Sequence, residues 1–315
     1  MKTVEKFISN KHLVLLVLII LLGAFLRLWR LNKVPMSLFG DEIDVGLQAK
    51  SILSTGRDYL STKYPVMFHS FTEYRLPLQL YLGVPFIKVF GLNEWGVRLP
   101  SAMMNIVALV LFYFLSRKLF NSKFAIISTI FLSISPWALQ FSRQANDASF
   151  VLPFILLRIL MFLKGLKNYK YLVLSAISFS LSFYSYAIAS VFVPIFVVSL
   201  LILYKKEILR YGFQKLSILA LICLAVLYPY IKVSFSGWST KRYSDISITS
   251  GNEIAKKVDE NRKWSNSSLA RIYYNKITIF FDETLKQYLS AYSTAFLFRS
   301  GDPNPRHSVG ELGEL

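Results

Sequence analysis

Apolar runs of spanning length recur along this chain and constrain its fold more than any other feature. A bilayer-crossing helix needs about 20 mostly apolar residues. Long apolar runs cover 13–31, 97–115, 124–141, 150–163, 171–204 and 216–231, and 171–204 is long enough for a tight pair of helices. Only 17% of residues are charged and 54% are hydrophobic. The pattern predicts an all-α integral membrane protein, a multi-span helical bundle of about seven spans.

Basic residues predict which loops face the cytoplasm, because Lys and Arg collect there in membrane proteins. The first apolar run follows Lys2, Lys6 and Lys11 and lacks a small-residue cleavage site, which indicates an uncleaved signal anchor with a cytoplasmic N-terminus. Seven spans also place the three short basic loops in the cytoplasm, at 116–123, 164–170 and 205–215.

The segment 76–90 is too short and too rich in proline for a span, so we predict an interfacial or re-entrant helix on the outer face. The basic cytoplasmic loops account for most of the formal net charge of +18. The more specific explanation is that this charge attracts anionic lipid or a phosphate-bearing substrate. The basic residues are scattered between apolar spans, which argues against nucleic acid as a partner.

Two parts of the chain are expected. Residues 1–231 form the transmembrane bundle with an outer loop at 32–96, and 232–315 form a polar, helical, extracytoplasmic segment. In that segment 272–298 shows helical spacing, with one face formed by Phe281, Leu285, Leu289, Tyr292 and Phe296. No further span follows, so a C-terminally truncated chain is expected. The single cysteine, Cys223, allows no internal disulfide and no cysteine-based metal site.

Acidic residues open the first outer loop, just after the first span. Asp41, Glu42 and Asp44 stand at the start of a predicted amphipathic helix. Charge complementarity with the helix N-terminus, a contribution of about 0.3–1 kcal/mol, explains them without any function. Their place at the membrane surface, where a lipid headgroup lies, favours a catalytic base or a cation ligand.

Further polar candidates lie at the outer ends of the predicted spans. Glu73 precedes the interfacial segment, where an ion pair with Arg75 is the plain alternative, and Arg98 at the edge of the second span could simply snorkel. Arg143 and Asp147 follow the third span one helical turn apart. They form either a local salt bridge or part of an anion-binding site, since a guanidinium suits phosphate oxygens.

A polar loop near the end of the chain carries Arg299, Asp302, Arg306 and His307. It is either a turn or a segment that brings phosphate-binding groups into the site. No metal ligand set is predicted. A divalent cation near His307 stays an open alternative, although one histidine beside acidic and basic residues is weak support for a metal site.

Taken in order, these segments resemble a known family. Leu26-Arg27-Leu28-Trp29-Arg30 followed by Asp41-Glu42, the stretch 86–102, Ser135-Pro136-Trp137 with Arg143, and 299–307 are similar to GT-C glycosyltransferases of the protein mannosyltransferase-like and aminoarabinose-transferase-like branch. The resemblance implies an outer-face site in a prokaryotic plasma membrane. It also implies a polyprenyl- or dolichyl-phosphate sugar donor, inversion at the anomeric carbon, and a protein, lipid or glycan acceptor.

The resemblance also implies residue roles. Asp41, with Glu42 beside it, matches the first-loop acid, Glu73 the second acid, and Arg143 the outward arginine. Asp41 is then the expected general base, and Arg143, aided by Arg299 or Arg306, stabilises the departing lipid phosphate. Two alternatives remain. A transporter or flippase would carry ionisable residues along its spans, and a non-catalytic scaffold would bind lipid phosphate without turnover.

Overall fold

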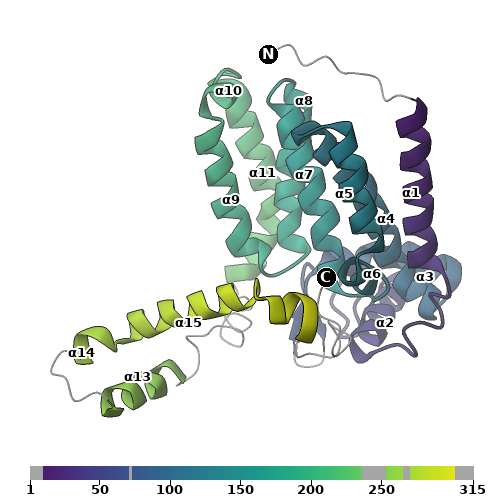
Figure 1. Cartoon of the computed structure of the whole chain (residues 1–315). Helices are drawn as coiled ribbons and strands as arrows, with labels where there is room; N and C mark the ends of the chain where they lie inside the picture. The colour runs from purple at the N-terminus through teal and green to yellow at the C-terminus, as the bar shows by residue number, and fades with distance from the viewer. Residues whose placement is uncertain (1–9, 71–72, 236–252, 265–269, 302–315) are drawn as a thin grey trace. The chain divides into compact units, whose positions relative to one another are not determined.

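The computed structural model describes residues 10–70, 73–235, 253–264 and 270–301. The chain divides into two compact units, Met1–Lys232 and Val233–Leu315. Nearly all the described secondary structure is helical (Figure 1). One short hairpin, which the sequence did not predict, pairs β1 (Phe68–Ser70) with β2 (Glu73–Arg75) in antiparallel register, His69 opposite Tyr74.

The first unit is built from helices of very different lengths. They are α1 (Asn10–Leu28), α2 (Gly40–Thr55), α3 (Pro77–Phe90), α4 (Glu94–Leu119), α5 (Ser122–Ile134), α6 (Pro136–Ser142), α7 (Val151–Gly165), α8 (Tyr169–Leu181), α9 (Ala189–Leu203), α10 (Lys205–Leu209) and α11 (Phe213–Val233). Short 3₁₀ turns, η1 (Asp147–Phe150) and η2 (Ser182–Tyr184), precede α7 and follow α8.

Four of the described helices are long and apolar enough to cross a membrane: Lys11–Leu28, Glu94–Leu119, Asp147–Gly165 and Phe213–Val233. The pair α5–α6, bent by 59°, makes a fifth if it counts as one span. The predicted multi-span, all-α integral membrane protein is therefore confirmed. The predicted count of seven also needs α8 and α9, which have 13 and 15 residues, so that number stays a prediction.

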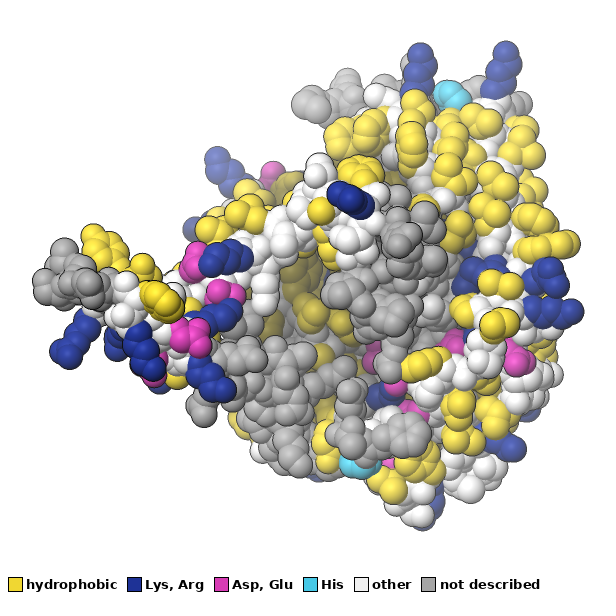
Figure 2. All heavy atoms as spheres, turned by 60° about the horizontal axis from the view of Figure 1, so that its bottom comes forward, with side chains coloured by type: hydrophobic (Ala, Val, Ile, Leu, Met, Phe, Trp, Pro, Cys, Tyr) yellow, Lys and Arg dark blue, Asp and Glu magenta, His cyan; other side chains and the backbone are white. Residues whose placement is uncertain are grey.

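The two ends of the helical bundle differ in charge. α2, α3, α6 and the hairpin lie at the end where α1 stops and α4 and α7 begin (Figure 1). Figure 2 brings this end forward and shows Asp and Glu side chains on it, with Lys and Arg side chains among them. The opposite end carries the basic turns between the long helices, with Arg117, Lys118, Lys123, Lys164, Lys170, Lys205 and Lys206.

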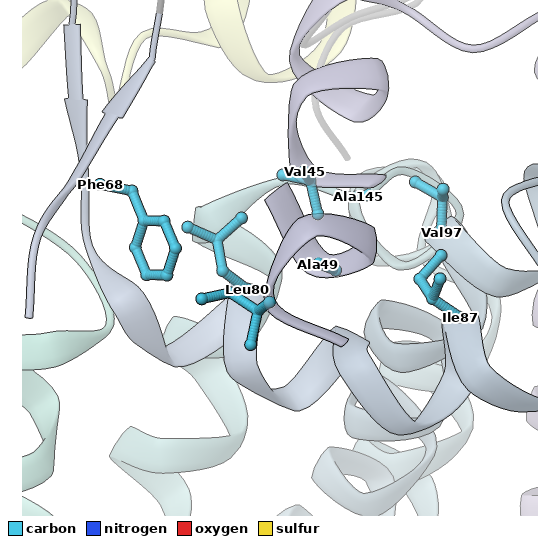
Figure 3. Close-up of a cluster of buried hydrophobic side chains, with 8 residues drawn as sticks. Val45, Ala49, Phe68, Leu80, Ile87, Val97 and Ala145 are labelled. Carbon is cyan, nitrogen blue, oxygen red and sulfur yellow. The ribbon is translucent and has the colours of Figure 1, made fainter. Parts of the chain in front are cut away.

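A buried cluster holds α2 and the hairpin onto α3 and α4. Its members are Val45, Ala49, Ile52, Phe68, Leu80, Ile87, Val97 and Ala145 (Figure 3). α2 approaches α4 closely at Gly46, where a Cβ atom would lie 2.6 Å from Leu92 Cδ1 and 2.9 Å from Val97 Cγ2. The cluster therefore fixes the helix that carries the first-loop acids.

Arg27 explains how α5 can end inside the bundle. Pro136 lacks an N–H and opens α6, so the carbonyl groups at the end of α5 need other donors. Arg27 of α1 is buried and donates from Nη1 to Ser133 O at 3.1 Å and from Nη2 to Leu132 O at 3.3 Å. The buried arginine thus caps the break between α5 and α6.

The second unit holds α13 (Glu253–Trp264), α14 (Ala270–Tyr273), α15 (Lys276–Ser290) and a π-helical turn, η4 (Phe296–Ser300). Ile254 and Val258 of α13 pack on Ile279 of α15. The predicted helical stretch 272–298 is thus broken into separate pieces. The side chain of Asn275 accepts from the backbone N–H groups of Ile277 and Thr278, and so starts a new helix.

Candidate functional site

α2 brings the first-loop acids together at its N-terminus. Phe39 is the extended N-cap residue, which puts Asp41 and Glu42 in the first turn. Glu42 Oε2 accepts from Phe39 N at 3.1 Å and so caps the N-terminus of the helix. Asp44 lies on the buried side of the same helix. The three acids therefore point into different surroundings although they are neighbours in the chain.

Glu42 forms a buried ion pair with Arg98 of α4. Arg98 Nε lies 2.9 Å from Glu42 Oε1, and Arg98 Nη2 lies 2.9 Å from Oε2. Oε1 also accepts from Ala145 N at 3.0 Å. Together with the bond from Phe39 N, four donors surround this carboxylate. An ionised carboxylate has about four acceptor positions, so Glu42 has little capacity left for a substrate.

Arg98 connects three segments of the first unit. Besides the two bonds to Glu42, it donates to Leu31 O at 3.1 Å, Pro35 O at 2.8 Å and Ser37 O at 2.6 Å. A guanidinium has five N–H donors, and all of them are used. The side chain is fully buried and does not snorkel. This geometry favours a positioning role for Glu42 and Arg98 over the predicted catalytic and binding roles.

Asp44 and Arg75 anchor the hairpin to α2. Asp44 Oδ2 accepts from Ser70 Oγ at 2.6 Å and lies 3.0 Å from Arg75 Nε. Asp44 Oδ1 accepts from Tyr59 OH at 2.9 Å. Because Asp44 is 1% exposed, it holds Arg75 in place without meeting solvent.

Asp41 is the open acid of this group. Its side chain is 49% exposed, and Oδ1 lies 2.6 Å from Arg75 Nη2. Burial alone would lower the pKa of Arg75, but the negative charges of Asp147, Asp41 and Asp44 outweigh burial and raise this pKa above its ordinary value. Arg75 therefore stays cationic among three carboxylates, of which Asp41 faces outward.

The remaining predicted residues have different placements. Arg143 follows α6 and donates to the carbonyls of Leu26 at 2.7 Å, Trp29 at 2.7 Å and Val34 at 3.0 Å, so it caps the end of α1. Asp147 opens η1 and is buried near Arg75. The structure thus brings Asp41, Asp44, Asp147 and Arg75 into one cluster.

The other candidates belong to β2, to the second unit or to residues outside the description. Glu73 is in β2, and its backbone alone is described. Arg299 is exposed in η4 of the second unit. Asp302, Arg306 and His307 lie outside the described residues. In the part of the chain that is described, no three His, Cys, Asp or Glu side chains form a metal-binding group. A divalent cation thus stays untested.

Arg75 is the site residue that sequence reasoning missed. It was considered only as a partner of Glu73, whereas in the structure it pairs with Asp41 and Asp44. Ser70 and Tyr59, which hold Asp44, were missed as well. No local pattern marks these residues, because their contacts depend on a short hairpin returning to α2.

Comparison with known proteins agrees with the membrane fold. The crystal structure of ArnT from Cupriavidus metallidurans in the apo state matches with a TM-score of 0.56 and 14% identity, covering 90% of this chain and 51% of that chain. AglB from Archaeoglobus fulgidus, in complex with an inhibitory peptide and a dolichol-phosphate, matches with a TM-score of 0.53 and 15% identity, covering 89% and 37%. At such identities the likeness shows the fold alone.

The chain spans about half the length of ArnT and a smaller share of AglB. No curated protein sequence matches it. Residues 75–232, about half of the chain, match the family model described as dolichyl-phosphate-mannose-protein mannosyltransferase. The resemblance expected from the sequence is thus confirmed: the chain belongs to the dolichyl-phosphate-mannose-protein mannosyltransferase family, within the GT-C superfamily of membrane glycosyltransferases.

Proposed function

We propose that this protein moves a sugar from a polyprenyl- or dolichyl-phosphate donor to a protein, lipid or glycan acceptor on the extracytoplasmic face. One observation carries the proposal: a half-exposed carboxylate, Asp41, is held on a buried frame of satisfied ion pairs at one end of the bundle. A reacting group needs such fixed geometry, because orientation supplies a large share of catalytic power.

The proposed reaction is a single displacement. Asp41 accepts the proton of an acceptor hydroxyl or amine as that group attacks the anomeric carbon. The bond between this carbon and the phosphate oxygen breaks, and its electron pair leaves with the lipid phosphate. The phosphate is ionised at neutral pH, so its departure needs no strong acid. One direct displacement inverts the anomeric configuration.

Arg75 and its partners support the base. Arg75 Nη2 lies 2.6 Å from Asp41 Oδ1 and orients this half-exposed carboxylate toward an acceptor. Glu42 and Arg98 position α2 beneath it. We assign Arg143 to holding the end of α1, because its Nη1 and Nη2 atoms already donate to carbonyl groups.

Contacts to the substrates remain proposals at five other positions. Glu73 is assigned to the acceptor side, because it lies in the same hairpin as Arg75. Arg299, Arg306 and His307, with Asp302 beside them, are assigned to the lipid phosphate on the family resemblance and on charge. Guanidinium groups suit phosphate oxygens better than ammonium groups do.

The charge difference between the bundle ends supports the outer face. The turns opposite the acid cluster hold many Lys and Arg residues and one acid among those described, Glu207. Such turns are cytoplasmic in most membrane proteins. The acid cluster would then face the periplasm or exterior, where lipid-linked sugars are used.

The test is sugar transfer from a panel of polyprenyl-phosphate sugars in membranes that contain the full-length gene product. Wild type is compared with Asp41→Asn and with Glu207→Gln, an acid at the opposite end. We expect loss of transfer only in Asp41→Asn, with unchanged membrane insertion. Transfer by Asp41→Asn would remove Asp41 from the mechanism. Binding of lipid phosphate by wild type without any transfer would support the scaffold alternative.

A further inference from the structure

α15 exposes a continuous apolar face that packs against none of the other helices described in its unit. Ile277, Phe281, Leu285, Tyr288 and Tyr292 are each between 56% and 69% exposed. Their spacings of three and four residues put them on one side of the helix and just beyond its end. Ile279, on the opposite side, packs against α13. The helix thus has one buried face and one open face.

The chemistry of the open face suits a membrane interface. Aromatic and aliphatic side chains lie side by side, with the rings of Tyr288 and Tyr292 5.2 Å apart. Trp264 and Tyr273 add exposed aromatic surface in the same unit. Tyr and Trp favour the headgroup level, where the ring is buried and the polar tip stays wet. A soluble surface rarely leaves such a patch open.

Charge on the same unit complements an anionic headgroup layer. Among its described residues, Lys and Arg number eight and Asp and Glu five. Figure 2 shows hydrophobic side chains of the α13–α15 pair open at the surface beside basic and acidic side chains. Lys276 and Lys286 lie on the side of α15 turned away from the apolar face, and Lys286 also pairs with Asp282 at 2.6 Å. Their charge therefore adds to the positive field of the unit near an anionic headgroup layer.

The chain itself keeps this helix near a bilayer. α11, a candidate span, ends at Val233, and residues 234–252 separate it from α13. A linker of that length reaches at most about 65 Å when fully extended. Tethering raises the local concentration of the membrane surface around the unit.

We propose that α15 lies in the plane of the bilayer interface, with its apolar face at the boundary between headgroups and acyl chains. Anionic lipid strengthens this contact through the basic residues of the unit. The inference is independent of the proposed sugar transfer, because it concerns how the second unit is held and not the chemistry of Asp41.

Site-directed fluorescence in the full chain tests the inference. Cys223, the single natural cysteine, is first replaced in a Cys223→Ala background. An environment-sensitive fluorophore is then attached through Phe281→Cys on the apolar face or through Gln287→Cys, an exposed position on the other side of α15. Each protein is reconstituted in vesicles of phosphatidylcholine with or without phosphatidylglycerol.

We expect a blue-shifted emission at position 281 and a several-fold stronger quenching by spin-labelled lipid than at position 287. Quenching at 281 should increase with phosphatidylglycerol and fall on Lys276→Gln with Lys286→Gln. Two results would overturn the proposal. Free access of aqueous iodide to position 281 would leave the face in water. Protection from iodide without lipid quenching would assign it to a protein surface, either this chain or a second copy.

Discussion

At the scale of single residues, two neighbouring carboxylates have opposite surroundings. Glu42 is buried and accepts from Arg98 and two backbone N–H groups, whereas Asp41 is half-exposed and pairs with Arg75 through Oδ1. The sequence predicted both as catalytic. Chemistry needs an acid that a substrate can reach, so the environment divides the pair into a candidate base and a positioning residue.

Arg98→Leu is expected to destabilise the protein strongly. The change leaves Glu42 as a buried charge without its partner and removes the donors to three backbone carbonyls. Breaking a buried ion pair costs about 3–5 kcal/mol. Thermal unfolding in detergent should show a lower midpoint for Arg98→Leu. Asp41→Asn serves as the matched variant and should unfold near the wild-type temperature. Equal stability of Arg98→Leu and wild type would contradict the positioning role.

At the scale of elements, close contacts between helices decide where the acid-bearing helix lies. α2 packs on α4 at Gly46. Arg27 of α1 caps the end of α5, and Arg143, which follows α6, caps the end of α1. In an apolar environment an orphan carbonyl is costly. The two arginines therefore stabilise helix ends that a soluble protein would leave to water.

Gly46→Ala tests the contact between α2 and α4. The added methyl group would press on Leu92 and Val97, and overpacking of this kind costs about 1–3 kcal/mol. We expect a lower unfolding midpoint and weaker sugar transfer, because α2 carries Asp41. Gly40→Ala in the same helix has open space around the new methyl group and is the control. A result in which both substitutions behave alike would show that the close approach is unimportant.

Arg27→Met tests the cap on α5. Methionine keeps much of the side-chain volume but leaves the carbonyls of Leu132 and Ser133 without the arginine donors. An unsatisfied buried polar group costs about 1–3 kcal/mol. The variant should unfold at a lower temperature in detergent, while Lys33→Met, at an exposed position, should not. Unchanged stability of Arg27→Met would mean that other groups satisfy the break.

At the scale of the first unit, acidic side chains gather at one end of the bundle. Basic turns lie at one end, and the cluster of Asp41, Asp44, Asp147 and Arg75 lies at the other. Under the proposed function, the basic turns that orient the bundle would also set the compartment of the site.

Cysteine labelling in intact cells checks this orientation. In the Cys223→Ala background, Lys50→Cys lies on an exposed position of α2, and Lys123→Cys lies at the start of α5. A membrane-impermeant thiol reagent should label position 50 in intact cells and position 123 only after permeabilisation. The reverse pattern would place the acid cluster in the cytoplasm and contradict the proposed outer-face site.

The sequence by itself determined the membrane class, the positions of most long helices and the family. These features follow from local signals: apolar runs of spanning length, prolines that end helices, and motifs that stay in order along the chain. The short segment at 76–90 is an example, since it is helical as predicted over Pro77–Phe90. Each of these signals can be read without knowing what lies beside it in space.

Only the tertiary structure decided which arginine each acid meets and which acid stays exposed to solvent. Asp41 meets Arg75 across 34 positions, and Glu42 meets Arg98 across 56. The sequence offered Glu73 as the partner of Arg75, because neighbours in a chain are the simplest guess. The hairpin turns Arg75 toward Asp41 and Asp44 of α2, and the side chain of Glu73 lies outside the description. Arginines and carboxylates carry no local sign of their partners, so pairing emerged only once packing at Gly46 and the buried cluster had placed the helices.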